Sequence, residues 1–175
     1  KPTSDPVQFF AFVSFFPQLV AGPIERASNL LPQFSTKRVF DAEQAITGLR
    51  LILWGLFKKM VIADRVAELV DIIFSAPGQA NATVSVLGGV LFAYQVYCDF
   101  SGYSDIAIGA ARLFGFRLMR NFMTPFHAVS MTELWQRWHI SLSTWFRDYL
   151  YIPLGGSRTS TVRWTVNILA TYTIS

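Results

Sequence analysis

The longest stretches without a charged side chain constrain this chain more than any other feature. Asp5 is followed by 19 uncharged residues, PVQFFAFVSFFPQLVAGPI, and residues 72–98 form a run of 27 uncharged residues. A helix needs about 20 mostly apolar residues to cross a bilayer. We therefore predict that residues 5–25 and 84–98 are embedded in a membrane. Pro17 lies inside the first stretch and predicts a kink or break there.

The composition supports a membrane protein. Hydrophobic residues make up 52% of the 175 residues and charged residues 15%, whereas soluble domains have about 25% charged residues. The net charge of +4 comes from scattered Lys and Arg residues without a dense basic run, which fits lipid headgroups better than nucleic acid. The single cysteine, Cys98, cannot form an internal disulfide. The chain begins at Lys1 and stops inside an apolar run, so we expect a piece of a longer protein.

The remaining segments predict further helices and their connections. Residues 27–41 are expected to form an exposed loop, residues 42–75 one long or broken helix, and residues 75–83 a turn. The helix over residues 84–98 is expected to run into Asp99. The sequence after Cys98, DFSGYSDIAIGAARLFGF, has a helical part that is rich in small residues. Small residues let membrane helices approach closely. The alternative interpretation is a flexible segment. These small residues are Gly102, Ala107, Gly109, Ala110 and Ala111.

The segment WQRWHISLSTWFRDYLYIPLGG, residues 135–156, places a histidine among tryptophans and charged residues. Ser130 and Glu133 fit a capping box that starts a helix, and Pro153 ends it. At about 100° per residue, His139 shares one face of this predicted helix with aromatic and apolar side chains. That face carries Trp135, Trp138, Leu142, Trp145, Phe146 and Tyr149, and the opposite side carries Arg137, Ser141 and Asp148.

His139 is the best single candidate for chemistry. An imidazole titrates near neutral pH, so it can take a proton from a hydroxyl nucleophile and return it. Apolar surroundings would keep the imidazole neutral, as a general base requires. The alternative is a core histidine that hydrogen-bonds a backbone carbonyl. A metal site is not expected, because His127 and His139 have no carboxylate at metal-ligand spacing.

Several charged residues have both a functional and a structural interpretation. An acid inside a membrane helix is costly, so Asp105 is expected to face the bundle interior and to pair with an Arg or with Ser or Tyr hydroxyls. Asp99 is interpreted as a helix N-cap or an interfacial charge. Arg147 and Asp148 form either a structural ion pair or part of a polar channel. Arg120 and Arg137 are candidates for binding an anionic donor or a lipid headgroup, and Cys98 is interpreted as a small buried residue.

Three stretches of the chain resemble the membrane-bound O-acyltransferase family, in particular its bacterial alginate O-acetylation branch. They are FPQLVAGPIERASNLLPQF (16–34), YQVYCDFSGYSDIAIGAARLFGF (94–116) and NFMTPFHAVSMTELWQRWHISLSTWFRDYLYIPLGG (121–156). The resemblance implies an all-α, multi-spanning transmembrane bundle with a central funnel. Residues 1–175 would be part of a single such membrane domain that lacks its N-terminal and C-terminal portions.

The resemblance also implies an activity. Family members transfer an acyl group from a thioester donor to a hydroxyl, and the histidine of their W-x-x-W-H motif maps onto His139. A second family histidine is expected beyond Ser175, so the chain alone is expected to be inactive. The residues implied to line the funnel or position substrate are Trp135, Trp138, Arg137, Arg147, Asp148 and Asp105.

The implied partners are membrane lipid, an acyl-thioester donor (acetyl-CoA or an acyl carrier) and periplasmic proteins that acetylate polysaccharide, but no nucleic acid. No bound cofactor is expected, and the implied location is the bacterial inner membrane, crossed several times. Two alternatives stay open at this point. One is a transporter or channel with Asp105, Arg147 and His139 along its pathway. The other is a scaffold subunit that recruits a soluble acetyltransferase.

Overall fold

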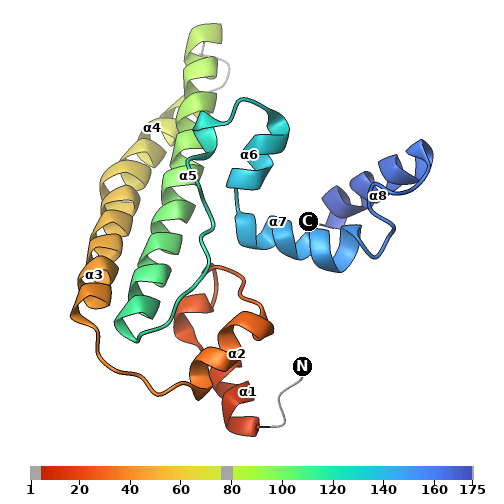
Figure 1. The fold of residues 1–175 in the computed structure, drawn as a ribbon. Coiled ribbons are helices and arrows are strands. Elements are labelled where there is room, and N and C mark those ends of the chain that lie inside the picture. The colour runs from red at the N-terminus through yellow and green to blue at the C-terminus, as the bar shows by residue number, and fades with distance from the viewer. Residues whose placement is uncertain (1–4, 76–80, 175) are drawn as a thin grey trace. The chain divides into compact units, whose positions relative to one another are not determined.

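A computed structural model describes residues 5–75 and 81–174 of the chain, and every regular element in these residues is a helix (Figure 1). The predicted all-α class is therefore confirmed. The contacts divide the chain into two compact units, Lys1–Leu118 and Met119–Ser175. The first contains α1 (Pro6–Val13), η1 (Phe16–Gln18), α2 (Ala27–Ser35), α3 (Ala42–Leu56), η2 (Phe57–Ala63), α4 (Asp64–Ser75) and α5 (Ala82–Leu113). The second contains η3 (Pro125–His127), α6 (Met131–Arg137), α7 (Ile140–Phe146), η4 (Arg147–Tyr151) and α8 (Thr161–Ile174).

Helix α5 is the longest element of the first unit. Its N-cap is Asn81, whose side-chain oxygen accepts a hydrogen bond from the Val84 amide at 2.9 Å. Among the described residues, α5 is the one helix long and apolar enough to cross a membrane, and it includes the predicted segment 84–98. The interpretation of Asp99 as a helix N-cap is wrong, because Asp99 lies in the middle of this helix. Of the predicted turn at residues 75–83, residues 76–80 lie outside the described part.

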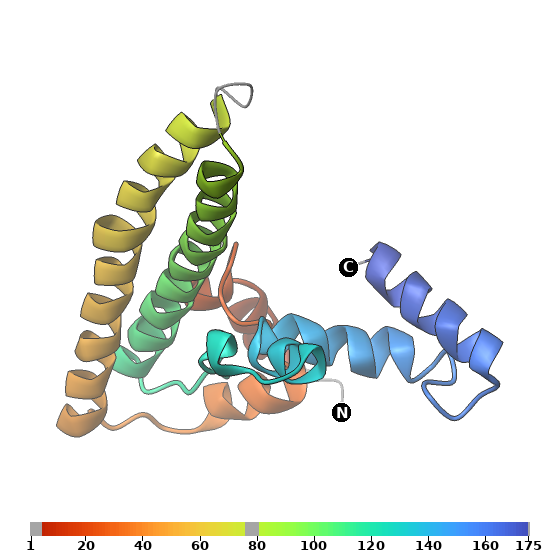
Figure 2. The same cartoon turned by 90° about the horizontal axis from the view of Figure 1, so that it is seen from above.

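Residues 42–75 form a continuous helical rod beside α5, as Figure 1 and Figure 2 both show (orange to yellow, next to green). Asp41 caps its start by accepting hydrogen bonds from the amides of Glu43 and Gln44. The middle of the rod, η2, is π-helical. A π-helix has one more residue per hydrogen-bonded turn than an α-helix. It is rare in proteins overall, but where it occurs it often lies at a functional site. The predicted long or broken helix is thus one rod with a π-helical insertion.

Two glycine pairs bring α3 and α5 into close contact. A Cβ atom on Gly48 would lie 2.8 Å from the Gly109 carbonyl oxygen, and one on Gly102 would lie 2.8 Å from the Gly55 carbonyl oxygen. The two glycines that α3 contributes are seven residues apart, and so are the two that α5 contributes. The same face of each helix therefore meets the other in antiparallel register over two turns. The predicted role of the small residues of α5 in close helix packing is confirmed. Their partners, the glycines of α3, were not predicted.

Charged side chains also bridge the rod and α5. Lys58 is buried, and its Nζ lies 2.8 Å from an Asp105 carboxylate oxygen and 2.9 Å from Ser101 Oγ. Lys59 Nζ lies 2.6 Å from Asp99 and 2.8 Å from Asp64. The prediction that Asp105 is paired is confirmed, but its partner is a lysine of η2 rather than an arginine. Pairing offsets the cost of removing these charges from water.

The N-terminal segment does not form the predicted membrane-spanning helix. Helix α1 ends at Val13, before Pro17, and its eight residues are too short to cross a bilayer. A turn follows in which Val20 has a φ of 69°, and the Tyr103 hydroxyl donates to the Leu19 carbonyl at 3.0 Å. This hydrogen bond attaches the turn to α5. The embedding of residues 5–25 in the bilayer stays a prediction.

Residues 27–35 form helix α2, so the prediction of an exposed loop over residues 27–41 is wrong for this part. The loop interpretation relied on Pro32, which the helix contains. Burial outweighs the hydrogen bond that the proline removes. Leu30 is fully buried in a cluster with Phe15, Ala111 and Phe116, against which Phe34 packs.

The glycine contacts predict that replacing glycine by alanine changes stability differently at two positions of α5. Gly102→Ala should lower the free energy of unfolding by about 1–3 kcal/mol, because the new methyl group forces the backbones of α3 and α5 apart. Gly89→Ala is the matched control, because a Cβ there has no neighbour within 4 Å. It should be neutral or stabilise by up to about 1 kcal/mol through helix propensity. Thermal unfolding in detergent measures both variants, and equal effects would refute the close contact.

Candidate functional site

His139 lies at a break between two short helices. Helix α6 starts at the N-cap Ser130, whose Oγ accepts a hydrogen bond from the Glu133 amide at 3.1 Å. The Glu133 carboxylate accepts the Val129 amide at 2.8 Å, so the predicted capping box is confirmed, with Val129 instead of Ser130 as the second donor. The prediction of one continuous helix through residues 131–152 is wrong. Trp138 is extended and His139 has φ 40° and ψ 55°, the left-handed region.

The break is held by Asn121, which is fully buried. Its carbonyl oxygen accepts the Ile140 amide at 2.8 Å, and its side-chain oxygen accepts the Ser141 hydroxyl at 2.5 Å. The Met123 amide donates to the Arg137 carbonyl at 3.0 Å. Residues 121–123 thus bind the backbone on both sides of His139. A left-handed conformation is costly for a residue other than glycine and persists only where its surroundings impose it.

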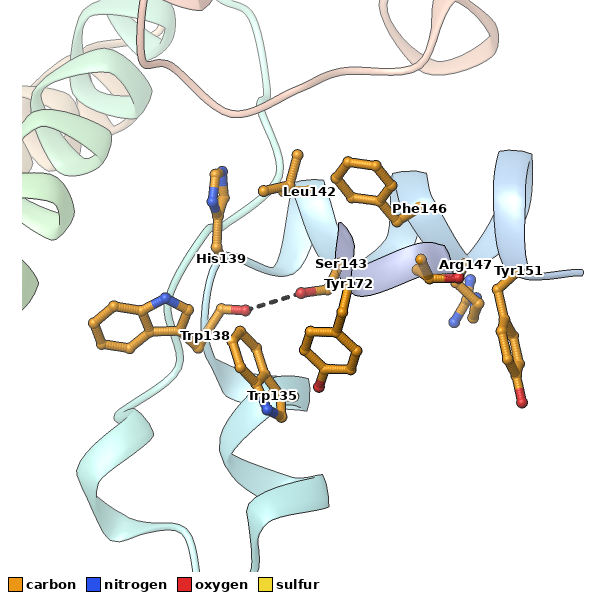
Figure 3. A pocket seen from close by; sticks show the side chains of 10 residues that line it. Trp135, Trp138, His139, Leu142, Ser143, Phe146, Arg147, Tyr151 and Tyr172 are labelled. Carbon is orange, nitrogen blue, oxygen red and sulfur yellow. Dashed lines mark hydrogen bonds between the residues drawn. The ribbon is translucent and has the colours of Figure 1, made fainter. Parts of the chain in front are cut away.

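Ser143 hydrogen-bonds to both residues of the break. Its amide donates to the His139 carbonyl at 3.0 Å, and its hydroxyl donates to the Trp138 carbonyl at 3.2 Å. The second of these hydrogen bonds is drawn in Figure 3. The backbone around His139 is therefore held in one arrangement by hydrogen bonds from both neighbouring segments.

A cavity of about 360 Å³ opens beside His139. Figure 3 shows its lining side chains, which are mostly aromatic or apolar. They are Trp135, Trp138, His139, Leu142, Ser143, Phe146, Arg147, Tyr151, Thr171 and Tyr172. Such an apolar pocket with a few polar groups is typical of small-ligand sites. A second hollow of about 780 Å³ adjoins the first and shares six lining residues with it: Trp135, Ser143, Arg147, Tyr151, Thr171 and Tyr172.

Aromatic rings from segments far apart in sequence pack against one another around the pocket. The Trp135 ring packs edge-on against Tyr172 of α8, with ring centroids 5.8 Å apart. Phe122 packs edge-on against Trp138 at 5.2 Å and lies nearly parallel to the His139 ring at 6.5 Å. Asn167 holds α8 in place by donating to the carbonyls of Leu154 (3.1 Å) and Gly156 (3.2 Å).

Burial lowers the pKa of the His139 imidazole below its usual range. The lowered pKa keeps the ring neutral at pH 7, so one ring nitrogen is free of a proton. Such a group can accept a proton from a hydroxyl in the pocket. Among the described residues, no three His, Cys, Asp or Glu side chains are grouped so that they could hold a metal ion.

Four of the seven predicted site residues line the pocket: Trp135, Trp138, His139 and Arg147. Arg137 instead pairs with Glu133 at 2.5 Å and reaches Thr124 Oγ1 at 3.3 Å. The hydrogen bonds from the Val129 amide and Arg137 lower the pKa of Glu133. Asp148 forms an ion pair with Arg147 at 2.8 Å, and Asp105 belongs to the other unit. None of these three is among the lining residues.

Sequence reasoning missed four lining residues: Ser143, Tyr151, Thr171 and Tyr172. Ser143 lies four residues after His139, so helical spacing was a usable signal. Tyr172 and Thr171 lie more than thirty residues away in sequence, and no local pattern connects them to His139. Trp145 and Tyr149, predicted for the same face, pack against each other with tilted rings whose centroids are 5.2 Å apart, and they are not among the lining residues.

Comparison with known proteins gives consistent matches. Residues 2–175 match the model of the MBOAT, membrane-bound O-acyltransferase family. The chain is 44% identical over 169 residues to the probable alginate O-acetylase AlgI of Pseudomonas aeruginosa, covering 97% of this chain and 32% of that protein. It is 42% identical over 154 residues to the peptidoglycan O-acetyltransferase of Helicobacter pylori (87% of this chain, 29% of that protein).

A more distant relative is the teichoic acid D-alanyltransferase of Bacillus subtilis, 31% identical over 148 residues (81% of this chain, 36% of that protein). The chain therefore spans about a third of the length of the curated relatives it matches.

The hydrogen bond between Asn121 and Ser141 predicts a coupled effect. Asn121→Ala leaves the buried Ser141 hydroxyl without this acceptor and should lower the free energy of unfolding by about 1–3 kcal/mol. In the double variant Asn121→Ala/Ser141→Ala the loss should be clearly smaller than the sum of the two single losses. Denaturant unfolding of all three variants measures the coupling. Strict additivity would show that the bond does not hold the break.

The lowered pKa of His139 predicts a pH-dependent stability. The unfolded chain binds a proton at the usual imidazole pKa of about 6.5, whereas the folded chain resists protonation until lower pH. This contribution to stability is present above pH 6.5 and decreases as the pH falls below it. His139→Gln should reduce the stability loss between pH 7 and pH 5, measured by thermal unfolding. His127→Gln is the control, because His127 is exposed, and it should leave the loss unchanged.

Proposed function

The chain belongs to the membrane-bound O-acyltransferase family, and on this premise we propose that its protein transfers an acyl group, most simply acetyl, from a thioester donor to a polysaccharide hydroxyl. The observation that carries the proposal is the position of His139 in an aromatic pocket, where burial lowers the pKa of its imidazole. The named relatives support an acetyl group, since identity is 44% and 42% to the two O-acetylating proteins and 31% to the D-alanyltransferase. Among hydroxyl acceptors, alginate-like polysaccharide is our first choice.

His139 would act as the general base. A hydroxyl is a weak nucleophile at neutral pH, and a positioned base removes its proton as it attacks the thioester carbonyl carbon. The new C–O bond forms, the C–S bond breaks, and the proton taken by the imidazole passes to the departing sulfur to give a thiol. The products are an ester and a free thiol, so atoms and charge balance.

The pocket walls would favour transfer to the sugar over transfer to water. Trp135, Trp138 and Phe146 present apolar surface around the imidazole. Exclusion of water from such a site strengthens polar interactions and suppresses hydrolysis of the thioester. Arg147 is the one cation among the lining residues, and its charge is partly offset by Asp148. We assign it to positioning of a polar group of donor or acceptor.

The donor would be acetyl-CoA or an acyl carrier thioester, and the protein would act in the bacterial inner membrane with periplasmic polysaccharide-acetylating partners. The candidate spanning helix α5 supports the membrane location. The full protein would also contribute groups outside this chain, including the second histidine expected after residue 175. The experiments below therefore use the full-length protein.

Substitution of His139 tests the proposed base. His139→Ala should reduce acyl transfer by about 10²–10⁴-fold, the usual contribution of general acid–base catalysis. His139→Gln should fail equally, because an amide keeps hydrogen bonding but cannot take a proton near pH 7. The measurement is polysaccharide acetylation together with the amount of protein in the membrane.

The matched control is His127→Gln, which removes the other histidine of the chain and should leave acetylation near normal. Near-normal acetylation in His139→Gln would assign the proton transfer to another group. Activity in both His139 variants would favour a scaffold that recruits a soluble acetyltransferase.

A transporter is the second candidate, and the observation that favours it is the ion pair between the buried Lys58 of η2 and Asp105 of α5. Charges within a membrane bundle often mark ion or substrate pathways. Transfer of labelled acetyl to polysaccharide separates the two candidates. Export of the label without ester formation by the purified full-length protein would support transport.

A further inference from the structure

A polar pocket lies at one end of the α3–α5 pair, within the first unit. The linker between α2 and α3 lies against the chain that follows α5. A hollow of about 640 Å³ opens there, and two neighbouring hollows of about 480 Å³ and 250 Å³ share Asp41 and Gln44 with it. We call this the basic pocket; its cationic side chains are Lys37, Arg38, Arg112 and Arg117.

Arg38 is fixed as part of the wall. Its guanidinium donates to the Gly115 carbonyl at 2.5 Å and to the Gln33 carbonyl, and it lies 4.1 Å from the centre of the Phe116 ring. Gly115 has a φ of 76°, a conformation that favours glycine, and this turns its carbonyl toward Arg38. Gln33 also exchanges two hydrogen bonds with the backbone of Arg117. These hydrogen bonds hold Arg38 and Gln33 in place along the wall.

The other cations are not neutralised. In the part of the chain that the structure describes, Lys37, Arg112 and Arg117 form no ion pair, whereas Lys58, Lys59 and Arg137 do. Two carboxylates, Asp41 and Glu43, lie among the lining residues. Asp41 is already engaged, because its side chain accepts the amides of Glu43 and Gln44 as the N-cap of α3. Four cations against two carboxylates leave the pocket positive.

A buried donor adds a second, independent observation. Gln44 is half-buried, and its side-chain nitrogen is shielded from solvent and has no hydrogen-bond acceptor. Gln44 lines all three hollows. An unsatisfied buried donor costs about 1–3 kcal/mol, and a bound ion or water is a common explanation of one. A change of the Gln44 side-chain rotamer would let its amide donate to an anionic oxygen held by Arg112 and Arg117.

We propose that the basic pocket binds a phosphate group. Arginine guanidinium groups bind phosphate through paired, charge-assisted hydrogen bonds, and an amide donor completes such a site. Arg112 lies in the last turn of the helix that can cross the membrane, where basic side chains meet anionic headgroups. The same chemistry is offered by a phospholipid headgroup and by a soluble phosphate, and the experiment separates these sources.

The test uses the full-length protein in detergent, with phosphatidylglycerol, phosphatidylcholine or inorganic phosphate as the probe. Bound lipid is counted by native mass spectrometry, and phosphate binding is measured by calorimetry. The double variant Arg112→Gln/Arg117→Gln should weaken binding at least about tenfold, because charged hydrogen bonds to phosphate are lost. Gln44→Glu, nearly the same size, should weaken it similarly by placing a carboxylate at the buried donor. The control Arg65→Gln removes an exposed charge outside the pocket and should bind as the unsubstituted protein does.

Each outcome decides the proposal. Selective retention of phosphatidylglycerol that is lost in both pocket variants supports a lipid headgroup site. Binding of inorganic phosphate with the same pattern supports a soluble phosphate ligand. Binding that is absent, or equal in the pocket variants and in Arg65→Gln, overturns the proposal. Thermal unfolding without added anion shows that each variant is folded, so loss of binding is not confused with loss of structure.

Discussion

The close contact between the backbones of α3 and α5 is the interaction on which the first unit depends. The glycine pairs Gly48–Gly109 and Gly55–Gly102 leave no room for a side chain between the helices. Because the helices approach so closely, Lys58 of η2 meets Asp105 and Ser101 of α5, and Lys59 meets Asp99. The contact therefore offsets the cost of placing charges on a helix that is otherwise apolar enough to span a membrane.

Charged residues of two kinds, paired and unpaired, lie at different positions along the α3–α5 pair. Lys58, Lys59, Asp99 and Asp105 satisfy one another near η2. At the other end, Arg112 and Arg117 remain without carboxylate partners among the described residues. Paired charges serve the packing of the helices, whereas unpaired charges are available to a ligand. This contrast is the physical basis for assigning phosphate binding to the basic pocket.

The second unit depends on a different constraint, the interruption of the helix at His139. A continuous helix would have placed the imidazole in a regular row with Trp135 and Leu142. Instead, Asn121 binds the backbone beyond the break, and His139 takes a left-handed conformation. Such strain is characteristic of functional sites, where the surrounding structure imposes a side-chain direction. The proposed general base is thus positioned by a residue that precedes it by eighteen positions and that has no proposed part in the chemistry.

The sequence by itself determined the helical class, the 84–98 segment of α5, the helix start at Ser130 with Glu133, and four residues of the His139 pocket. These depend on local rules, because caps, uncharged length and helical spacing involve residues that are near in the chain. Only the tertiary structure decided the break at His139, the partner of Asp105, helix α2 around Pro32 and the place of Tyr172 in the pocket. In each case the deciding contact joins residues distant in sequence, and periodicity shows which residues share a face but not which distant group meets that face.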